Sequence, residues 1–281
     1  MSELFNTPVS DGTVSSATAR AAKDLAGFSA AVRKKIAGAD VAHFDETGFR
    51  ADGKLHWLHS ASTTMFTMFT CHARRGREAM NAAGILPAFT GIAVHDAWAP
   101  YDTYPQMTHA LCNPHLLREL IAVTDHHARS PDPTSWCWAA QVIDNLLAIK
   151  TMADAGPVDP VRLALRRTLL AHAARIGATT PTPGPVGAKH RALARRIDRR
   201  IEDYLRFATD PRSPWDNNAA ERKIRTAKLR QKISGGMRTL TGAQHFAALR
   251  SYLATTAKHG VNGLDALIQL TTGNPWQPQT T

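Results

Sequence analysis

The sequence predicts an α/β protein in which a helical stretch interrupts a core of about five strands. Two observations support this prediction: alternating, β-branched and aromatic segments are concentrated between residues 41 and 112, and helical periodicity dominates after residue 115. The chain has 281 residues, of which 43% are hydrophobic and 20% are charged. This composition is that of a globular protein and excludes wholesale disorder.

The strands are expected after a helical lead-in. Residues 18–37 have helical spacing of apolar residues, and the Asp52-Gly53 pair predicts a tight turn between the first two strands. We expect strands over residues 41–49, 55–63, 65–73, 91–98 and 109–112, with a short helix over 74–84.

The remaining elements are expected to be helical. The helices predicted from apolar periodicity span residues 115–123, 135–156, 159–177, 191–207 and 218–234. A break rich in proline and glycine is expected at 179–187. Thr241 and Gln244 have the spacing of a capping box, which predicts a helix start there, and the tail after Gly273 is expected to fray.

The composition also excludes several protein classes. No apolar run approaches the roughly 18 residues that cross a bilayer, and the N-terminal sequence lacks the features of a secretory signal. Three cysteines are too few for a disulfide scaffold and are typical of a reducing compartment. We therefore expect a cytoplasmic, nucleoid-associated protein without a membrane partner.

Positive charge is the most informative bulk property. The net charge is +11, and 15 basic against 6 acidic residues lie between Lys189 and Arg238. Such a concentration favours a polyanionic partner, nucleic acid above all, although a solvated basic helix face would have the same composition.

Three carboxylates stand out by their positions. Asp45 lies inside the first expected strand, Asp96 ends the fourth, and Glu221 falls in the first turns of a helix. Carboxylates converging at a sheet edge repel one another unless a cation enters, and Mg²⁺ prefers such oxygen ligands. Two ions of this kind promote phosphodiester displacement. From spacing alone, the alternative is that each acid is separately a cap, a turn residue or a surface group.

The strings around these acids resemble a known family. The motifs are Asp-Glu-Thr-Gly at 45–48, His-Asp at 95–96 and Asp-Asn-Asn-Ala-Ala-Glu-Arg at 216–222. In this order they resemble bacterial insertion-sequence DDE transposases of the IS-sixty-six type, from about residue 8 to 276. The resemblance implies a ribonuclease H-like mixed-sheet core with a helical insertion before the third acid. It also implies metal-dependent DNA strand cleavage and strand transfer, with Asp45, Asp96 and Glu221 as catalytic and metal-binding residues.

The resemblance implies a domain arrangement and partners. We expect a helical lead-in over 1–40, a catalytic core over 41–125 and 210–273, a helical insertion over 126–209 and a tail over 274–281. The expected cofactor is Mg²⁺, with Mn²⁺ able to substitute. The expected partner is DNA, as element ends and target, bound by a homodimer or higher oligomer.

Basic residues after the third acid are candidates for phosphate contacts. Arg225, Lys228 and Lys232 share one helical stripe, and Arg222 and Lys223 adjoin it. A solvated helix face is the alternative for each of them. Trp57, Trp98 and Trp215 lie near the acids, where packing is expected rather than stacking on a base.

Other residues near the acids have local explanations. Glu46 should face away from Asp45, because strand side chains alternate, and Asp52 belongs to the hairpin turn. Asp216 and Asn217 are expected to cap the helix of Glu221. Cys112 and His115 have the spacing of half a zinc site, which Cys71 and His72 could complete only poorly. The resemblance favours a structural or active-site-adjacent role for Cys112 and His115.

Three activities remain open from the sequence. The chain is a transposase catalytic region, a metal-dependent nuclease of the same fold, or a truncated remnant that binds DNA without transposing. Members of the family carry a further N-terminal recognition region, and this chain begins near the start of their catalytic region. We therefore expect that end-recognition region to be missing here.

Overall fold

The computed structural model describes residues 10–181, 183–218, 220, 224 and 237–278. It is a mixed α/β fold with a five-stranded sheet, as the sequence predicts. The chain divides into two compact units. The sheet unit comprises Met1–Ala93, Trp98–Thr108 and Asn218–Thr281, and the helical unit comprises Val94–Ala97 and His109–Asn217.

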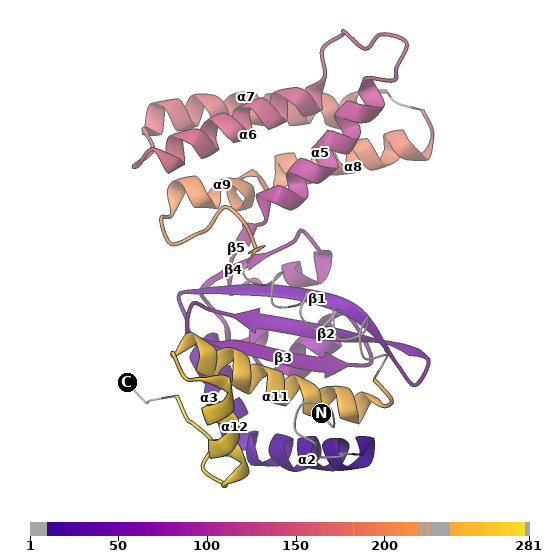
Figure 1. The fold of residues 1–281 in the computed structure, drawn as a ribbon. Coiled ribbons are helices and arrows are strands. Elements are labelled where there is room, and N and C mark those ends of the chain that lie inside the picture. Colours follow the sequence, from indigo (N-terminus) through magenta and orange to yellow (C-terminus); the bar gives the residue numbers. More distant parts are fainter. Residues whose placement is uncertain (1–9, 182, 219, 221–223, 225–236, 279–281) are drawn as a thin grey trace. The chain divides into compact units, whose positions relative to one another are not determined.

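Five strands form the sheet in the order β3-β2-β1-β4-β5 (Figure 1). They span Val41–Ala51 (β1), Lys54–Ser62 (β2), Thr67–His72 (β3), Ile92–His95 (β4) and Thr108–Leu111 (β5). The first three pair antiparallel, and β1 is the middle strand of the sheet. The boundary between the units falls within β4 and β5.

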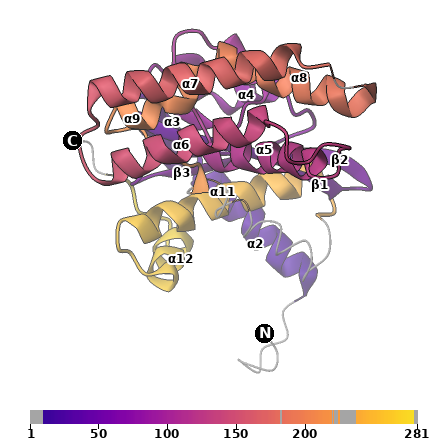
Figure 2. The same ribbon diagram turned by 90° about the horizontal axis from the view of Figure 1, so that it is seen from above.

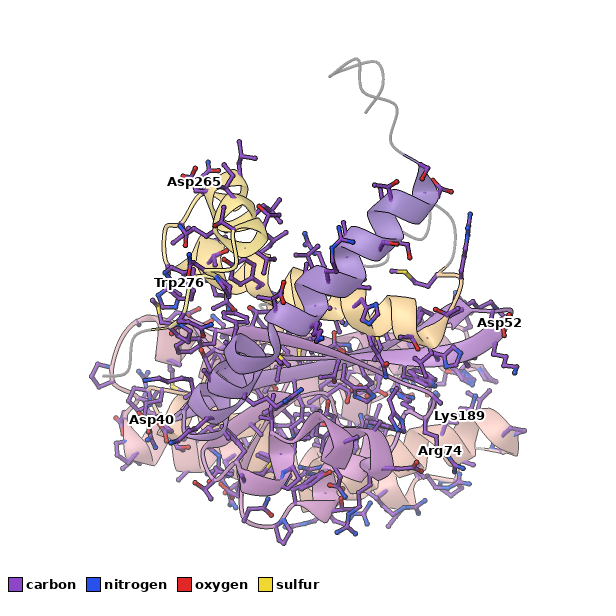
Figure 3. The ribbon with its side chains drawn as sticks, turned by 90° about the horizontal axis from the view of Figure 1, so that it is seen from below. Asp40, Asp52, Arg74, Lys189, Asp265 and Trp276 are labelled. Carbon is purple, nitrogen blue, oxygen red and sulfur yellow. The ribbon has the colours of Figure 1, made fainter. Side chains whose placement is uncertain are left out.

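A two-residue turn joins β1 to β2. Asp52 and Gly53 both have positive φ, 52° and 69°, as a tight hairpin turn requires. Figure 3 shows Asp52 at the end of this hairpin. The turn brings Asp45 opposite Ser60 and Glu46 opposite His59 in the strand register. The predicted hairpin is therefore confirmed, and it sets which side chains accompany Asp45.

Helix α11 (Leu240–Lys258) covers the exposed edge of β3 (Figure 1). The Thr255 hydroxyl accepts a hydrogen bond from the Thr67 backbone N–H at 3.1 Å and donates one to the Thr67 carbonyl at 3.0 Å. Ser251 Oγ accepts from the Phe69 N–H at 2.8 Å. These hydroxyls replace a neighbouring strand, which removes an edge open to further pairing.

The start of α11 corrects the expected capping box. The helix begins at Leu240, and the side chain of Thr239 accepts from the Gly242 N–H. Thr239 rather than Thr241 is the N-cap, because a cap must precede the first helical residue.

Three further helices and the C-terminal tail complete the sheet unit. The helices are α2 (Asp11–Asp24), α3 (Ala26–Ala37) and α12 (Gly263–Thr271), the last of which the sequence did not predict. Leu25, between α2 and α3, is fully buried with Phe28 of α3. The prediction that the tail after Gly273 frays is wrong for its described residues. The Trp276 N–H donates to the Tyr252 hydroxyl at 3.0 Å, and the Trp276 ring packs on the core (Figure 3).

Short elements connect β3, β4 and β5. Helix α4 (Arg77–Ala83) ends at Gly84, whose φ of 72° suits a left-handed C-cap. The 3₁₀ turns η1 (Leu86–Ala88) and η2 (Ala99–Thr103) follow it. The η2 segment begins three residues after Asp96 in the chain.

The helical unit contains five helices among its described residues. They are α5 (Asn113–His127), α6 (Trp138–Asp154), α7 (Pro160–Thr179), α8 (Gly184–Arg199) and α9 (Ile201–Thr209). Helices α6, α7 and α8 lie side by side (Figure 2). The expected helix over 191–207 is in fact two helices that meet at Arg200, so that both Ile197 of α8 and Leu205 of α9 reach the unit's core. No helix in the described part of the chain is long and apolar enough to cross a membrane.

Candidate active site

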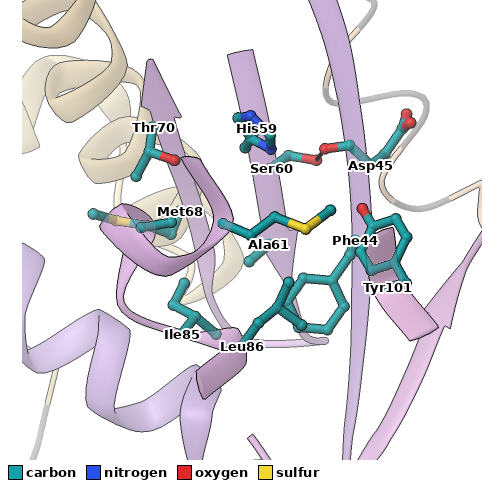
Figure 4. Close-up of a pocket in the computed structure, with 12 residues that line it drawn as sticks. Phe44, Asp45, His59, Ser60, Ala61, Met68, Thr70, Ile85, Leu86 and Tyr101 are labelled. Atoms are coloured by element: carbon teal, nitrogen blue, oxygen red, sulfur yellow. Dashed lines mark hydrogen bonds between the residues drawn. The ribbon is translucent and has the colours of Figure 1, made fainter. Parts of the chain in front are cut away.

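Asp45 lies on the middle strand of the sheet. Its carboxylate is half-buried, and Oδ1 accepts a hydrogen bond from the Glu46 backbone N–H at 2.8 Å. On the adjacent strand, the Ser60 hydroxyl is 3.4 Å from the Asp45 carbonyl oxygen. Figure 4 shows Asp45 and Phe44 projecting from opposite sides of β1. The carboxylate is therefore oriented by the backbone of the residue that follows it.

The sheet face of Asp45 also carries an apolar residue that follows the third acid closely in sequence. Phe49 alternates with Asp45 along β1, and Leu58 lies on the same face of β2. Ile224, which comes three residues after Glu221, is buried in one apolar cluster with Phe49 and Leu58. The residues around Glu221 in sequence thus include one that packs on the Asp45 side of the sheet.

Asp96 belongs to the helical unit and is half-buried. The preceding residue, His95, is fully buried, and its Nε2 lies 2.9 Å from Nδ1 of His109. Burial, with His109 adding to it, holds the pKa of His95 well below its usual value. His95 Nδ1 also contacts the Asp96 carbonyl oxygen. Asp96 is therefore preceded by a buried imidazole that links β4 to β5 through His109.

Cys112 contacts the chain segment that precedes Glu221 in sequence. Its Sγ accepts a hydrogen bond from the Asn217 backbone N–H at 3.3 Å. The side-chain amide of Asn113 donates to the Tyr204 carbonyl at 3.0 Å, and its backbone N–H donates to the Trp215 carbonyl at 3.2 Å. These bonds attach the start of α5 to the segment that leads toward Glu221.

The possible zinc site receives no support from the part of the chain that the structure describes. Within it, no three His, Cys, Asp or Glu side chains are grouped to hold a metal ion. Burial raises the pKa of Cys71 to about 12, which disfavours the thiolate that zinc requires. His115 lies on α5, and Asp216 is half-buried ahead of the described helical residue Asn218. The capping roles expected for Asp216 and Asn217 stay predictions.

A comparison with known families identifies the chain. A model of the transposase IS66 family matches residues 1–245. The chain belongs to this family. No curated protein matches the chain. Membership confirms the family predicted from the three sequence motifs, and it makes DNA the substrate class of the protein.

Several residues expected to act in this IS66 family transposase lie outside the described residues. They are the third acid and the five basic candidates, namely Glu221, Arg222, Lys223, Arg225, Lys228 and Lys232. Their roles in catalysis and DNA contact remain predictions.

Much of the described positive charge of the helical unit is paired within the unit. Arg200 and Arg206 both contact Asp203, at 2.8 Å and 3.3 Å. Arg212 contacts Asp210 at 2.7 Å, and these hydrogen bonds lower the pKa of Asp210 to about 2. Some arginines of the basic stretch between Lys189 and Arg238 are therefore already paired with acidic side chains, so the net charge alone does not tell how many can contact DNA.

The aromatic residues near the acids pack within the protein. Trp215 lies edge-on to Phe207 with ring centroids 4.7 Å apart, and Trp98 lies edge-on to Tyr101 at 6.1 Å. Sequence reasoning missed the surroundings of Glu46, whose side chain is almost completely buried. Only alternation along β1 indicated that Glu46 would face away from Asp45, and no sequence signal indicated its partners.

Proposed function

We propose that this IS66 family transposase acts through a DDE-type catalytic region, with Asp45, Asp96 and Glu221 as its catalytic acids. It would hydrolyse one phosphodiester bond at the element's end, and the freed 3′-hydroxyl would then attack a phosphodiester of target DNA, which joins the element to the target and releases a target 3′-hydroxyl. The observation that carries the proposal is the placement of Asp45, a half-buried carboxylate on the middle strand. Ile224, close to Glu221 in sequence, packs on the same face of that strand's hairpin.

The ribonuclease H-like architecture is part of the same proposal. The strand order β3-β2-β1-β4-β5, with three antiparallel strands at one side, is compatible with such a core. Helices α5 to α9 lie in sequence between Asp96 and Glu221, where the family resemblance implies a helical insertion. The homodimer or higher oligomer on DNA also remains a proposal.

The proposed cofactor is Mg²⁺, for which Mn²⁺ can substitute. Asp45 and Asp96 offer carboxylate oxygens, the donor type that Mg²⁺ takes, and both are half-buried rather than enclosed in apolar surroundings. Bound metal would supply Lewis-acid activation of the attacking oxygen and stabilisation of the leaving oxygen. In the protein, the Glu46 N–H holds one oxygen of Asp45, which orients this carboxylate before any metal binds.

The test compares matched Asp→Asn variants. Asp45→Asn and Asp96→Asn should each lower Mg²⁺-dependent nicking of a duplex carrying the element's terminal repeat by about 10³-fold, equivalent to about 4 kcal/mol. Asp52→Asn is the control, because it removes the same charge at the hairpin turn, where asparagine tolerates the observed φ of 52°.

The outcomes separate the three activities. Nicking and joining that disappear in both active-site variants and persist in Asp52→Asn support a transposase. Nicking without joining would identify a nuclease, and DNA binding without either reaction would identify a remnant. An Asp45→Asn variant that nicks at the parental rate would show that Asp45 is not a catalytic acid.

A further inference from the structure

Glu46 is an acid buried on the side of β1 opposite to Asp45. Its side chain is only 2% exposed, although it directly follows a proposed catalytic residue. Alternation along the strand places the two carboxylates on different faces of the sheet. A carboxylate removed from water is costly unless charged or polar partners surround it, so the partners of Glu46 must compensate for its burial.

Both oxygens of Glu46 have partners from other segments. Oε1 accepts from Arg75 Nη2 at 2.8 Å and from Arg75 Nε at 3.2 Å. Oε2 accepts from the Tyr101 hydroxyl at 2.8 Å. Arg75 comes from the segment between β3 and α4, and Tyr101 comes from η2. One carboxylate therefore fastens two connecting segments to the middle strand.

Two indole rings hold the guanidinium of Arg75 in place. Its central carbon lies 3.9 Å from the ring centroid of Trp98 and 4.9 Å from that of Trp57. A planar guanidinium can stack on aromatic rings while it donates two parallel hydrogen bonds, which a lysine cannot do. Trp98 also packs edge-on against Tyr101. The network is thus closed, because each partner of Glu46 is held by another contact.

The network reaches Asp45 through the backbone of Glu46. The Glu46 N–H donates to Asp45 Oδ1 at 2.8 Å, so the peptide that carries Glu46 also orients the Asp45 carboxylate. The three hydrogen bonds of the Glu46 side chain add to the β1–β2 ladder, in which Glu46 pairs with His59, in holding this stretch of β1 in place. Release of Glu46 would remove this side-chain anchor from the stretch of strand whose N–H orients Asp45.

We propose that Glu46 is a positioning residue that, with Arg75 and Tyr101, fixes the orientation of the Asp45 carboxylate for divalent metal. The inference rests on the proposed function, in which Asp45 binds that metal. Trp98 and Tyr101 follow Asp96 within five residues of the chain, so the same anchor also fastens to β1 the segment that leaves the second acid.

The test measures Mn²⁺ affinity by electron paramagnetic resonance, which needs no turnover, in the full chain and in three variants. Glu46→Gln, nearly equal in volume, should weaken Mn²⁺ binding about 10-fold, as loss of an outer-shell partner does. Tyr101→Phe, which removes one hydrogen bond and no charge, should weaken it about 3-fold. Glu78→Gln is the control, because it removes the same charge from an exposed ion pair with Arg74 at 3.2 Å.

Arg75→Gln distinguishes positioning from simple electrostatics. Removal of a cation near a metal site strengthens metal binding through charge alone. Loss of positioning weakens it instead, and we expect Arg75→Gln to bind Mn²⁺ several-fold more weakly than the parent. Thermal melting of each variant verifies that affinities are compared between folded proteins. Tyr101→Phe removes only one hydroxyl, so it keeps the inference testable if the charge-changing variants do not fold.

Two results would overturn the inference. One is tighter Mn²⁺ binding by Arg75→Gln, and the other is parental Mn²⁺ affinity in the folded Glu46→Gln, Tyr101→Phe and Arg75→Gln variants alike. Asp45→Asn separates these results from a failure of the proposed function. If Asp45→Asn keeps both parental cleavage and parental Mn²⁺ affinity, the function itself is wrong, whereas its loss of both with unchanged Glu46, Arg75 and Tyr101 variants rejects only the positioning role.

Discussion

The sheet unit and the helical unit place polar groups differently. The sheet unit buries the Glu46 ion pair and His59, and it uses Thr255 as a substitute strand partner. In the helical unit, Arg175 and Asp198 form an ion pair in which both partners remain accessible to water. Its interior also buries polar side chains, such as His95 and Asn113, but it contains in addition small residues in close contact, such as Gly177 against Trp138.

This difference shows how each unit achieves a specific structure. Buried polar groups tolerate few arrangements, because an unmade hydrogen bond inside a protein costs more than a made one contributes. Closely packed helices depend instead on side-chain volume, which one additional methyl group can disturb. A protein that must orient a carboxylate, as we propose for Asp45, gains from the first arrangement, which the sheet unit has.

The largest expected effect tests close packing in the helical unit. A Cβ added at Gly177 would lie 2.4 Å from the Trp138 ring, so Gly177→Ala should destabilise the unit by about 3 kcal/mol. Gly27→Ala in α3 is the control, because nothing lies within 4 Å of its added Cβ, and helix propensity should make it stabilising by up to about 1 kcal/mol. The free energy of unfolding in urea, followed by the amide hydrogen exchange of each unit, measures the effect of both substitutions. Equal changes in stability in the two variants would contradict the packing argument.

The next largest effect at neutral pH tests whether the buried hydrogen bonds between α11 and the edge of β3 stabilise the sheet unit. Thr255→Val removes the hydroxyl that bonds both backbone groups of Thr67, and it should cost about 2 kcal/mol. Thr256→Val is a matched control at the next, equally buried position of α11, because the Thr256 hydroxyl donates to the Leu253 carbonyl of the same helix. Amide exchange at Thr67 should accelerate in the first variant alone. Similar stability losses in both variants would show that the edge contact contributes little.

A pH titration tests the buried histidine of the sheet unit. Burial, with smaller effects of His72 and Arg75, lowers the pKa of His59 to about 4. Between pH 6.5 and 4 the unfolded chain binds a proton that the folded protein does not, so stability is full above pH 6.5 and falls as the pH drops. The expected loss by pH 4 is about 3 kcal/mol.

The control for this titration is His59→Gln, which removes the titrating group and retains a polar side chain. The variant should have a flatter dependence of unfolding free energy on pH over this window. His95 of the helical unit, whose pKa is also lowered, is common to both proteins and cancels in the difference. Parallel curves would mean that His59 is protonated as readily in the folded protein as in the unfolded chain.

The smallest expected effect is that of a surface ion pair in the helical unit. Arg175 Nε lies 3.0 Å from Asp198 Oδ1, with side chains 68% and 32% exposed. Asp198→Asn should change stability by less than about 0.5 kcal/mol, because water and salt screen such pairs. A measured loss above 1 kcal/mol that persists in 1 M salt would remove the contrast between the two units.

The sequence was sufficient to predict the first hairpin, most of the helices and the candidate acids. The alternation around Asp45 and the Asp52-Gly53 pair predict β1, β2 and their turn, because both signals arise within a few residues. Periodicity located α6 and α7 but not the division at Arg200, since an apolar stripe can continue across two helices. Family membership followed from the three motifs, and the arrangement of the three acids stays a prediction.

The sequence alone determined which residue types are available and which short segments become strands, turns and helices. Only the tertiary structure decided what Glu46 does, because its partners Arg75 and Tyr101 lie 29 and 55 residues away in the chain. The same holds for Trp276, expected in a loose tail yet bonded to Tyr252. Such contacts depend on the packing of distant segments, which periodicity and propensity do not encode, and they convert an apparently redundant acid beside Asp45 into the anchor of its strand.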